Sequence, residues 1–525
     1  MKTVLLGLDG ATFTILDHLV AEGVMPNLAE LYRKGARGDL MSTPTPLTPQ
    51  AWTSLATGRS PGHHGIIDFL RPEHGPHGVY WRLNDSREIH CETIWKYASR
   101  HGRRVTVLNY IYLSPPEPIH GHTIPGFTSG RHLRRSSYPP NLFERLQQVP
   151  GLDVKALGMD LQVEQEALQE MEPQRWCEWI RHHIERERIW FGILEHLMAE
   201  EPSDLTAIVL DGVDKIQHLA YRFLDPALLP QQPTPWETEV IATCRDYFRQ
   251  VDQFLGAILR RIGRWGRVFL ASDHGFAATT EVVYINKWLY DQGWLHWRGE
   301  FAEDEKLSNF GDRLANLANA IDLPRSQAYA LTPSINGILI VAPPEERGAI
   351  RAEIARRLLD LRGPDGGRVV TEVRTREEVF PGPFVDRAPD LLLTLRDHGF
   401  VSVLNARAAV ISRRQPAGTH HPRGVLVGIG PGIREGASVG PLSILDVAPL
   451  LLHSLGLEIP RELEGTFPSE LYDPDYLTSD PVRWGVTAGN VSLDQPPPSA
   501  PSGEPMDDQD EAYVIDQLRK LGYLE

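Results

Sequence analysis

Cysteine is scarce in this chain. Over 525 residues it has only three, Cys91, Cys177 and Cys244. They are too few and too widely spaced for a disulfide framework or for a zinc site built on cysteines. This usage fits a reducing interior, and we expect a cytoplasmic protein.

Long hydrophobic runs are also missing. No segment reaches the roughly 18 consecutive apolar residues that mark a candidate transmembrane helix. The apolar run near the amino end is short and is interrupted by Asp9, so it indicates a core strand and not a signal peptide. We therefore expect no transmembrane segment.

Positive charge is in deficit. The chain carries 53 basic against 69 acidic side chains, a formal net charge of −16. This balance argues against binding of a nucleic-acid duplex as the main function. A small phosphate-ester substrate stays compatible with it, because bound divalent metals can outweigh a distant acidic surface that salt partly screens.

Short apolar runs recur between amphipathic, helix-like segments. The clearest runs are Val4–Leu8, Leu205–Leu210, Val268–Ser272 and Val425–Gly428. Alternation of this kind predicts the α/β class, with a doubly wound, mainly parallel sheet flanked by helices. A chain of this length exceeds one simple core, so we expect insertions or a second domain.

The pattern divides the chain into a catalytic core and two insertions. We assign the core to residues 1–130, 202–283 and 386–485, with the segment 389–393 returning to the main sheet. A helical cap is expected at 131–201, with helices at 142–148, 162–171 and 173–198, and an α+β lobe at 284–385. A Pro/Ser/acidic disordered linker follows at 486–510 and a C-terminal helix at 511–525. That helix could dock on the domain or on a second subunit, which would give a homo-oligomer.

Residues 43–66 read as the mouth of an active site. A turn ends at Thr48-Pro49 and runs into a helical pattern at 50–56. Threonine is a preferred N-cap and proline favours the first helical position, so we expect Thr48 to cap this helix. The positive end of a helix dipole binds anions. A hydroxyl at such a place becomes a nucleophile when a metal ion lowers its pKa.

Candidate metal ligands follow the apolar runs, because side chains at the carboxyl ends of strands meet at one edge of an open α/β sheet. These candidates are Asp9, Asp214, His218, Asp273, His274 and His420. Asp214 and His218 have the i,i+4 spacing that puts both on one helix face. Two alternatives stay open: Asp211 competes with Asp214, and His421 with His420. Each residue alone also has a structural explanation, as a helix cap, a turn former or part of a solvated helix face.

Three further clusters are weaker. His63, His64, His74 and His77 could bind metal, although surface loops often carry such histidines. The basic run 131–135 could contact a phosphate or be a solvated loop, and residues 71–82 read as a polar loop. The glycines at 428, 430 and 432 do not have the spacing of a dinucleotide-binding motif.

The order Asp9, Thr48, Asp214-x-x-x-His218, Asp273-His274, His420 resembles the alkaline phosphatase superfamily, specifically its type I phosphodiesterase/nucleotide pyrophosphatase family. Thr48 stands ten residues before Gly58, and Pro61 and His64-Gly65-Ile66 follow as in that family. The segments 272–275 and 446–449 are also similar. The resemblance covers about 1–128, 204–290 and 386–470, and not the two insertions or the tail.

The resemblance implies a hydrolase of phosphodiester or pyrophosphate bonds with two divalent metal ions, usually zinc, while the ligand types also allow manganese or iron. One ion would be held by Asp214, His218 and His420, and the other by Asp9, Asp273 and His274, with Thr48 bridging towards the second. Thr48 would be the nucleophile and would form a phospho-threonine intermediate. The substrate would be a small phosphate ester, including nucleotides. Alternatives on the same site are a phosphomonoesterase, a transferase of a phosphate-bearing head group and a non-catalytic metal-binding protein.

The chain departs from the family at one place. The family has an asparagine after the His-Gly-Ile element that binds a non-bridging phosphoryl oxygen, and here that place reads Asp68-Phe69. Neither an ionised carboxylate nor a phenyl ring can donate that hydrogen bond. We expect backbone N–H groups at residues 48–50 or an arginine of the cap to replace it. Threonine at position 48 disfavours the sulfatases, which need a modified Cys or Ser there, and the phosphoglycerate mutases, which use Ser.

Overall fold

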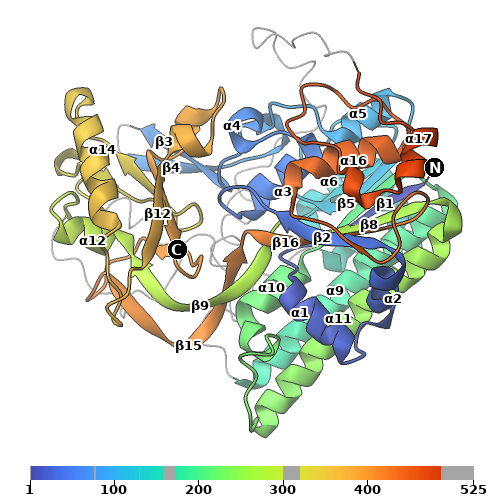
Figure 1. Ribbon diagram of the computed structural model, residues 1–525, viewed down its shortest axis with the longest axis horizontal. Helices are drawn as coiled ribbons and strands as arrows, with labels where there is room; N and C mark the ends of the chain where they lie inside the picture. Colours follow the sequence, from blue (N-terminus) through green and yellow to red (C-terminus); the bar gives the residue numbers. More distant parts are fainter. Residues whose placement is uncertain (1, 76–77, 129, 158–172, 299–319, 486–525) are drawn as a thin grey trace.

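The computed structural model describes residues 2–75, 78–128, 130–157, 173–298 and 320–485. A large α/β domain occupies one side of the molecule and a smaller lobe the other (Figure 1). The expected helix at 162–171, the linker at 486–510 and the C-terminal helix at 511–525 lie outside the described residues, as do the side chains of residues 73–81.

The large domain is built on a nine-stranded sheet. Its strand order is β17-β2-β16-β8-β1-β7-β5-β6, and β18 pairs with β2. Only β16 runs antiparallel to its neighbours, which confirms the predicted mainly parallel sheet. The strands are β1 Thr3–Leu8, β2 Ala36–Met41, β5 Val105–Tyr110, β6 Gly121–Pro125, β7 Leu205–Leu210, β8 Arg267–Ala271, β16 Arg423–Ile429, β17 Ala437–Ser438 and β18 Leu442–Ser443.

Burial on both faces explains the continuous apolar runs. Every residue of β1 is buried, and its side chains alternate between two cores, with Leu5 in one and Leu6 in the other. The first core is covered by α3 Thr48–Thr57, α5 Ile94–Arg100 and α16 Val447–Ser454. The second is covered by α1 Phe13–Ala21, α2 Pro26–Lys34, α6 Gly130–Ser136, α7 Leu142–Gln147, α9 Pro173–Glu200, α10 Gly212–Ala220 and α11 Pro235–Ile262.

The smaller lobe has its own four-stranded sheet, in the order β10-β11-β13-β12. Its elements are β10 Ala328–Tyr329, β11 Gly337–Ile340, β12 Val370–Thr375, β13 Leu391–Leu395, α12 Ile285–Asp291, α14 Pro344–Leu358 and α15 Arg376–Val379. The prediction that residues 389–393 return to the main sheet is therefore wrong, because β13 pairs with β11 and β12. The division of the chain into domains otherwise stays a prediction.

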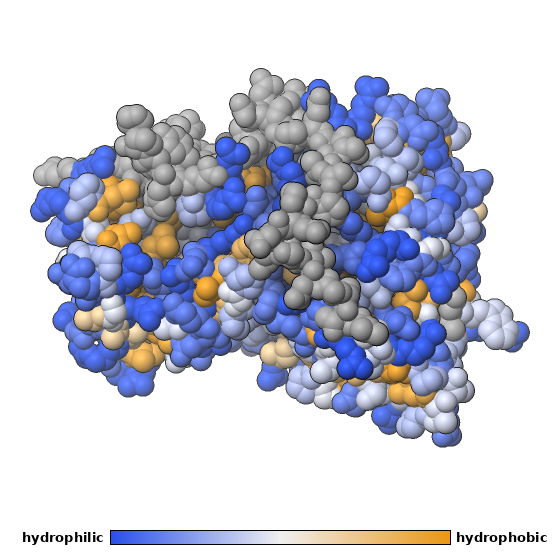
Figure 2. Space-filling view, turned by 90° about the horizontal axis from the view of Figure 1, so that it is seen from above, coloured by the Kyte–Doolittle hydropathy of each residue, from blue (hydrophilic) through white to orange (hydrophobic). Residues whose placement is uncertain are grey.

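Two long strands connect the lobe to the large domain. β9 Gly275–Tyr284 and β15 Val410–His421 pair antiparallel, and β14 Val401–Ser402 adds to β9. Figure 1 shows this ribbon arching from the sheet to the lobe. Figure 2 shows hydrophilic residues over most of the described surface on the face in view, with apolar residues in small separate groups.

Two local predictions need correction. Residues 71–82 are not a loop but belong largely to the hairpin of β3 Leu70–Gly75 and β4 Gly78–Leu83. Helix α3 begins one residue earlier than expected, so Leu47 is its N-cap and Thr48 its first helical residue. Gly58 ends α3 in the left-handed region, with φ 62°, which glycine adopts at low cost. Two short helices, α4 Pro61–His64 and α17 Pro474–Ser479, complete the helices named here.

Asp68 ties the two parts together where the chain leaves α4. Its carboxylate accepts hydrogen bonds from the hydroxyls of Thr332 at 2.8 Å and Ser334 at 2.9 Å, both in the lobe. Burial raises the pKa of Asp68 to about 6, against these hydrogen bonds, which lower it.

We expect the contribution of Asp68 to the free energy of unfolding to fall as the pH rises from about 4 to 6. In this range the folded protein keeps a proton on the carboxyl that the unfolded chain has lost, so deprotonation favours unfolding, by up to about 3 kcal/mol. Above pH 6 the effect levels off. Urea unfolding of the wild type and of Asp68→Asn across this range measures it, since the variant has no carboxyl to titrate. Parallel pH profiles for the two proteins would contradict the expectation.

Candidate active site with two acid–histidine groups

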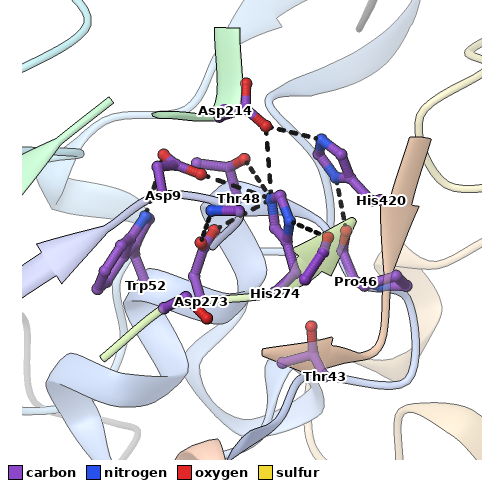
Figure 3. Close-up of polar contacts among 12 residues, drawn as sticks. Asp9, Thr43, Pro46, Thr48, Trp52, Asp214, Asp273, His274 and His420 are labelled. Carbon is purple, nitrogen blue, oxygen red and sulfur yellow. Dashed lines mark hydrogen bonds and ion pairs between the residues drawn. The ribbon is translucent and has the colours of Figure 1, made fainter. Parts of the chain in front are cut away.

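The carboxyl ends of three neighbouring strands deliver most of the site. Asp9 follows β1, α10 follows β7 and carries two candidates, and the pair 273–274 follows β8; the last candidate lies near the end of β15. The structure brings them together as two groups, each with its ligand atoms within 4.8 Å of one another. The groups are Asp214, His218 and His420, and Asp9, Asp273 and His274. Figure 3 labels all of these residues except His218.

The first group converges on one carboxylate oxygen. Asp214 Oδ1 lies 3.4 Å from His218 Nε2 and 3.2 Å from His420 Nε2. The two Nε2 atoms are 3.0 Å apart. Three ligand atoms of the right types therefore face a common point, as one bound cation requires.

The second group adjoins the first and includes the threonine. His274 Nε2 lies 3.5 Å from Asp9 Oδ1 and 3.3 Å from Asp273 Oδ2. The Thr48 hydroxyl is 3.3 Å from the same nitrogen. Asp214 Oδ1 is only 4.0 Å from it, so the two groups form one continuous centre with Thr48 at its edge.

Outer hydrogen bonds orient the histidines. His420 Nδ1 lies 2.8 Å from the carbonyl oxygen of Pro46, and His274 Nδ1 lies 3.1 Å from that of Gly275. A carbonyl only accepts, so each Nδ1 carries the proton and each Nε2 turns a lone pair to the centre. Such contacts around a ligand fix its ring and raise its basicity.

Gly10 fits this place because it has no side chain. Its backbone N–H donates to Asp273 Oδ1 at 3.1 Å. Its φ is +67°, and a Cβ there would lie 2.7 Å from the Phe276 ring. Glycine therefore lets the chain turn after β1 while its N–H holds the carboxylate of Asp273.

Three carboxylates are buried here with incomplete compensation. Burial raises the pKa of Asp9, with Asp273 and Asp214 adding to the effect, and burial raises the pKa of Asp273 to about 8. Burial also opposes ionisation of Asp214, but His218 and His420 outweigh it and hold its pKa well below the usual value. Burial lowers the pKa values of His274 and His420, so both are neutral and can act as ligands.

The donor set fits divalent cations. Within the described chain, no hydrogen-bond donor reaches Asp9 Oδ1 or Asp273 Oδ2, although both atoms are buried. Buried carboxylate oxygens without donors are costly unless a cation faces them. Mixed carboxylate and imidazole ligands suit Zn²⁺, and also Mn²⁺ or Fe.

The structure separates the rival residues. Asp211 points away from both groups into a buried ionic cluster, where its carboxylate contacts Arg186 at 2.9 Å and Lys215 at 3.1 Å. The neighbouring Glu187 accepts the backbone N–H of Gly212 at 2.8 Å. Two residues of α9 thereby hold the start of α10, which carries Asp214 and His218.

His421 has a different neighbourhood from His420. Its Nδ1 accepts the backbone N–H of Arg423 at 3.2 Å, and its ring packs edge-on against His398. Neither His421 nor Asp211 belongs to the two groups that the described residues form.

The weaker clusters have structural roles where they are described. His64 is fully buried and contacts the Ser54 hydroxyl at 3.0 Å, and His63 contacts Ser60. The side chains of His74 and His77 lie outside the described residues. The basic run at 131–135 forms part of helix α6 and not a loop, and its Arg134 pairs with Glu144 at 2.7 Å.

The phosphoryl-binding asparagine of the family has no replacement at residues 68–69. Asp68 faces the lobe, and Phe69 is 1% exposed and belongs to the first core. The expectation that backbone N–H groups or a cap arginine replace it stays a prediction.

Sequence reasoning missed two residues of the segment 43–66 that contact candidate ligands. These are Pro46, through its carbonyl, and Trp52, whose indole N–H donates to Asp9 Oδ2 at 3.3 Å. The spacing of Trp52 from Thr48, one helical turn, was the available signal.

The fold and the site together define an alkaline-phosphatase-like α/β protein with adjoining acid–histidine groups. The family model of the type I phosphodiesterase / nucleotide pyrophosphatase family matches residues 3–423. The chain belongs to that family. No curated protein matches it.

Solved structures share the fold at low sequence identity. Murine ectonucleotide pyrophosphatase / phosphodiesterase 5 is 14% identical, with a TM-score of 0.51, and the match covers 90% of this chain and all of that one. Phosphonoacetate hydrolase from Sinorhizobium meliloti 1021, in complex with phosphonoformate, is 14% identical, with a TM-score of 0.51 over 87% of this chain and 95% of that one. Among the described residues, no helix is both long and apolar enough to cross a membrane.

We expect Zn²⁺ uptake at pH 7 to release protons. The raised pKa values leave the Asp9–Asp273 pair partly protonated without an ion, and a bound cation requires both to be ionised. Calorimetric titration of chelator-treated protein, in two buffers that differ in ionisation enthalpy, measures the release. Equal apparent enthalpies in the two buffers would mean that the carboxylates are already ionised and would contradict the expectation.

Proposed function

We propose that the protein hydrolyses phosphodiester or pyrophosphate bonds with two divalent metal ions and with Thr48 as the nucleophile. The observation that carries this proposal is the Thr48 hydroxyl at the start of α3, 3.3 Å from His274 Nε2 at the edge of the two groups. Family membership supports the reaction class.

Six residues would hold the ions. Asp214, His218 and His420 would bind one, and Asp9, Asp273 and His274 the other, with zinc the best match to these ligand types. When bound, the ions would supply positive charge that lowers the pKa of a nucleophilic hydroxyl and stabilises a leaving oxygen.

The chain's own residues position the reaction. The first turn of α3 places the Thr48 oxygen where backbone N–H groups and the helix dipole favour an anionic phosphoryl group. Oγ1 would form a bond to phosphorus while the bond from phosphorus to the leaving oxygen breaks. Water would then cleave the phospho-threonine and restore the hydroxyl.

The substrate would be a small phosphate ester, and a nucleotide ester is the first to test. An inactive variant of murine ectonucleotide pyrophosphatase / phosphodiesterase 5 has been solved in complex with AMP. The absence of the family's asparagine at Asp68-Phe69 predicts weaker dependence on a single phosphoryl contact and more on the helix terminus.

Thr48→Ala should abolish turnover of bis-p-nitrophenyl phosphate by zinc-loaded protein. Loss of a nucleophile in a concerted site costs about a thousand-fold or more in kcat. Thr48→Ser, which keeps a hydroxyl, should retain measurable activity. Thr53→Ala is the matched control, because Thr53 is also buried in α3 but belongs to neither group.

The same assay separates the alternatives. Faster turnover of p-nitrophenyl phosphate than of the diester would indicate a monoesterase, and products that depend on an added alcohol would indicate a transferase. Full activity of Thr48→Ala would exclude the threonine mechanism. Two bound metals without turnover of any ester would point to a binding protein.

A further inference from the structure

Trp52 lies one turn after Thr48 on the same face of α3 and contacts a ligand of the second group. Its side chain is fully buried, and its indole N–H donates to Asp9 Oδ2 at 3.3 Å (Figure 3). An indole has a single donor and no acceptor. Trp52 is therefore the donor of this hydrogen bond, and the carboxylate of Asp9 is the acceptor.

This hydrogen bond leaves the two oxygens of Asp9 with different tasks. Oδ2 is held by the indole, while Oδ1 lies 3.5 Å from the unprotonated His274 Nε2 and accepts no hydrogen bond among the described residues. A carboxylate fixed through one oxygen presents the other in a constant direction. That direction is toward the centre of the second group.

The indole ring is itself held on several sides. Tyr110 packs against it edge-on, with ring centroids 5.4 Å apart, and the Tyr110 hydroxyl donates to the Trp52 carbonyl at 2.6 Å. On β1, Gly7 leaves room for the ring, since a Cβ there would lie 2.6 Å from its outer edge. To turn away from Asp9, the ring would have to displace either β1 or the Tyr110 side chain of β5.

We propose that Trp52 is a positioning residue, which holds Asp9 in the orientation that binds the metal ion of the second group. Because Trp52 and Thr48 share α3, the same helix sets the place of the nucleophile and of a carboxylate beside it. This inference rests on the proposed two-metal site, but its test does not depend on turnover.

Trp52→Phe should weaken Zn²⁺ binding at the second group by about 10- to 100-fold, the usual cost of losing an outer contact to a metal ligand. Affinity at the first group should change by less than about three-fold, because outer contacts act on their own ligand. Competition of chelator-treated protein with a fluorescent zinc chelator measures both sites. The His218→Ala background disables the first group and isolates the second.

Trp95→Phe is the matched control. Trp95 is also buried and packs edge-on against the same Tyr110 ring, at 5.1 Å, but it touches no candidate ligand. It undergoes the same chemical change, so a general loosening of this core would weaken zinc binding in both variants alike. Equal losses in the two variants would overturn the proposal, and so would unchanged affinity in Trp52→Phe.

Trp52→His separates positioning from packing. Its five-membered ring can place Nε2–H where the indole N–H stands, while losing the outer ring that fills the core. We expect thermal stability to rank Phe above His, and zinc affinity at the second group to rank His above Phe. If Trp52→Phe does not fold, zinc affinity of Trp52→His within about ten-fold of the wild type supports the proposal, and a larger loss overturns it.

The outcomes also distinguish this inference from the proposed function. Zinc-bound wild type that hydrolyses esters, with no effect of Trp52→Phe on affinity, overturns only the role of Trp52. The expected affinity order without any ester turnover supports the role of Trp52 and leaves the hydrolase proposal refuted. Wild type that binds no divalent metal overturns both.

Discussion

The structure depends most on one electrostatic constraint: three carboxylates, from Asp9, Asp214 and Asp273, share a buried space a few ångströms across. Burial alone would protonate such a group or drive it apart. Two of the three already have raised pKa values, while contact with His218 chiefly holds the pKa of the third, Asp214, below its usual value. A sheet that ends its parallel strands side by side supplies this crowding, and a bound divalent cation would relieve it.

Much of the fold could be predicted from the sequence, because a strand that is buried on both faces of a sheet has a continuous apolar sequence. β1 and β7 read as continuous apolar runs, and their parallel pairing places the residues after them at one edge. A similar apolar run in β13 correctly predicted a buried strand. It did not predict the strands that pair with β13, since hydrophobicity does not show to which sheet a strand belongs. The hairpin at 70–83 was missed because its glycines, prolines and histidines are typical of loops.

The sequence indicated which candidate ligands would lie together, but not the contacts around them. Acid and histidine residues at strand ends can be recognised from their positions in the sequence. The contact between Trp52 and Asp9 cannot, because the two residues are 43 positions apart. A buried tryptophan on an apolar helix is also typical of a core. The carbonyl of Pro46 has no side chain to signal its bond to His420. The choice between Asp211 and Asp214 needed the three-dimensional neighbours, Arg186 above all, which comes from α9.

The ribbon of β9 and β15 begins where the site ends. Phe276, two residues after His274, pairs with His420 itself, and the strands then run out to the lobe. Strand register at the near end thus fixes the spacing between two candidate ligands whatever stands at the far end. The ribbon therefore separates its two ends: a change in the lobe at the far end leaves the pairing of Phe276 with His420 in place, and with it the spacing of these two candidate ligands.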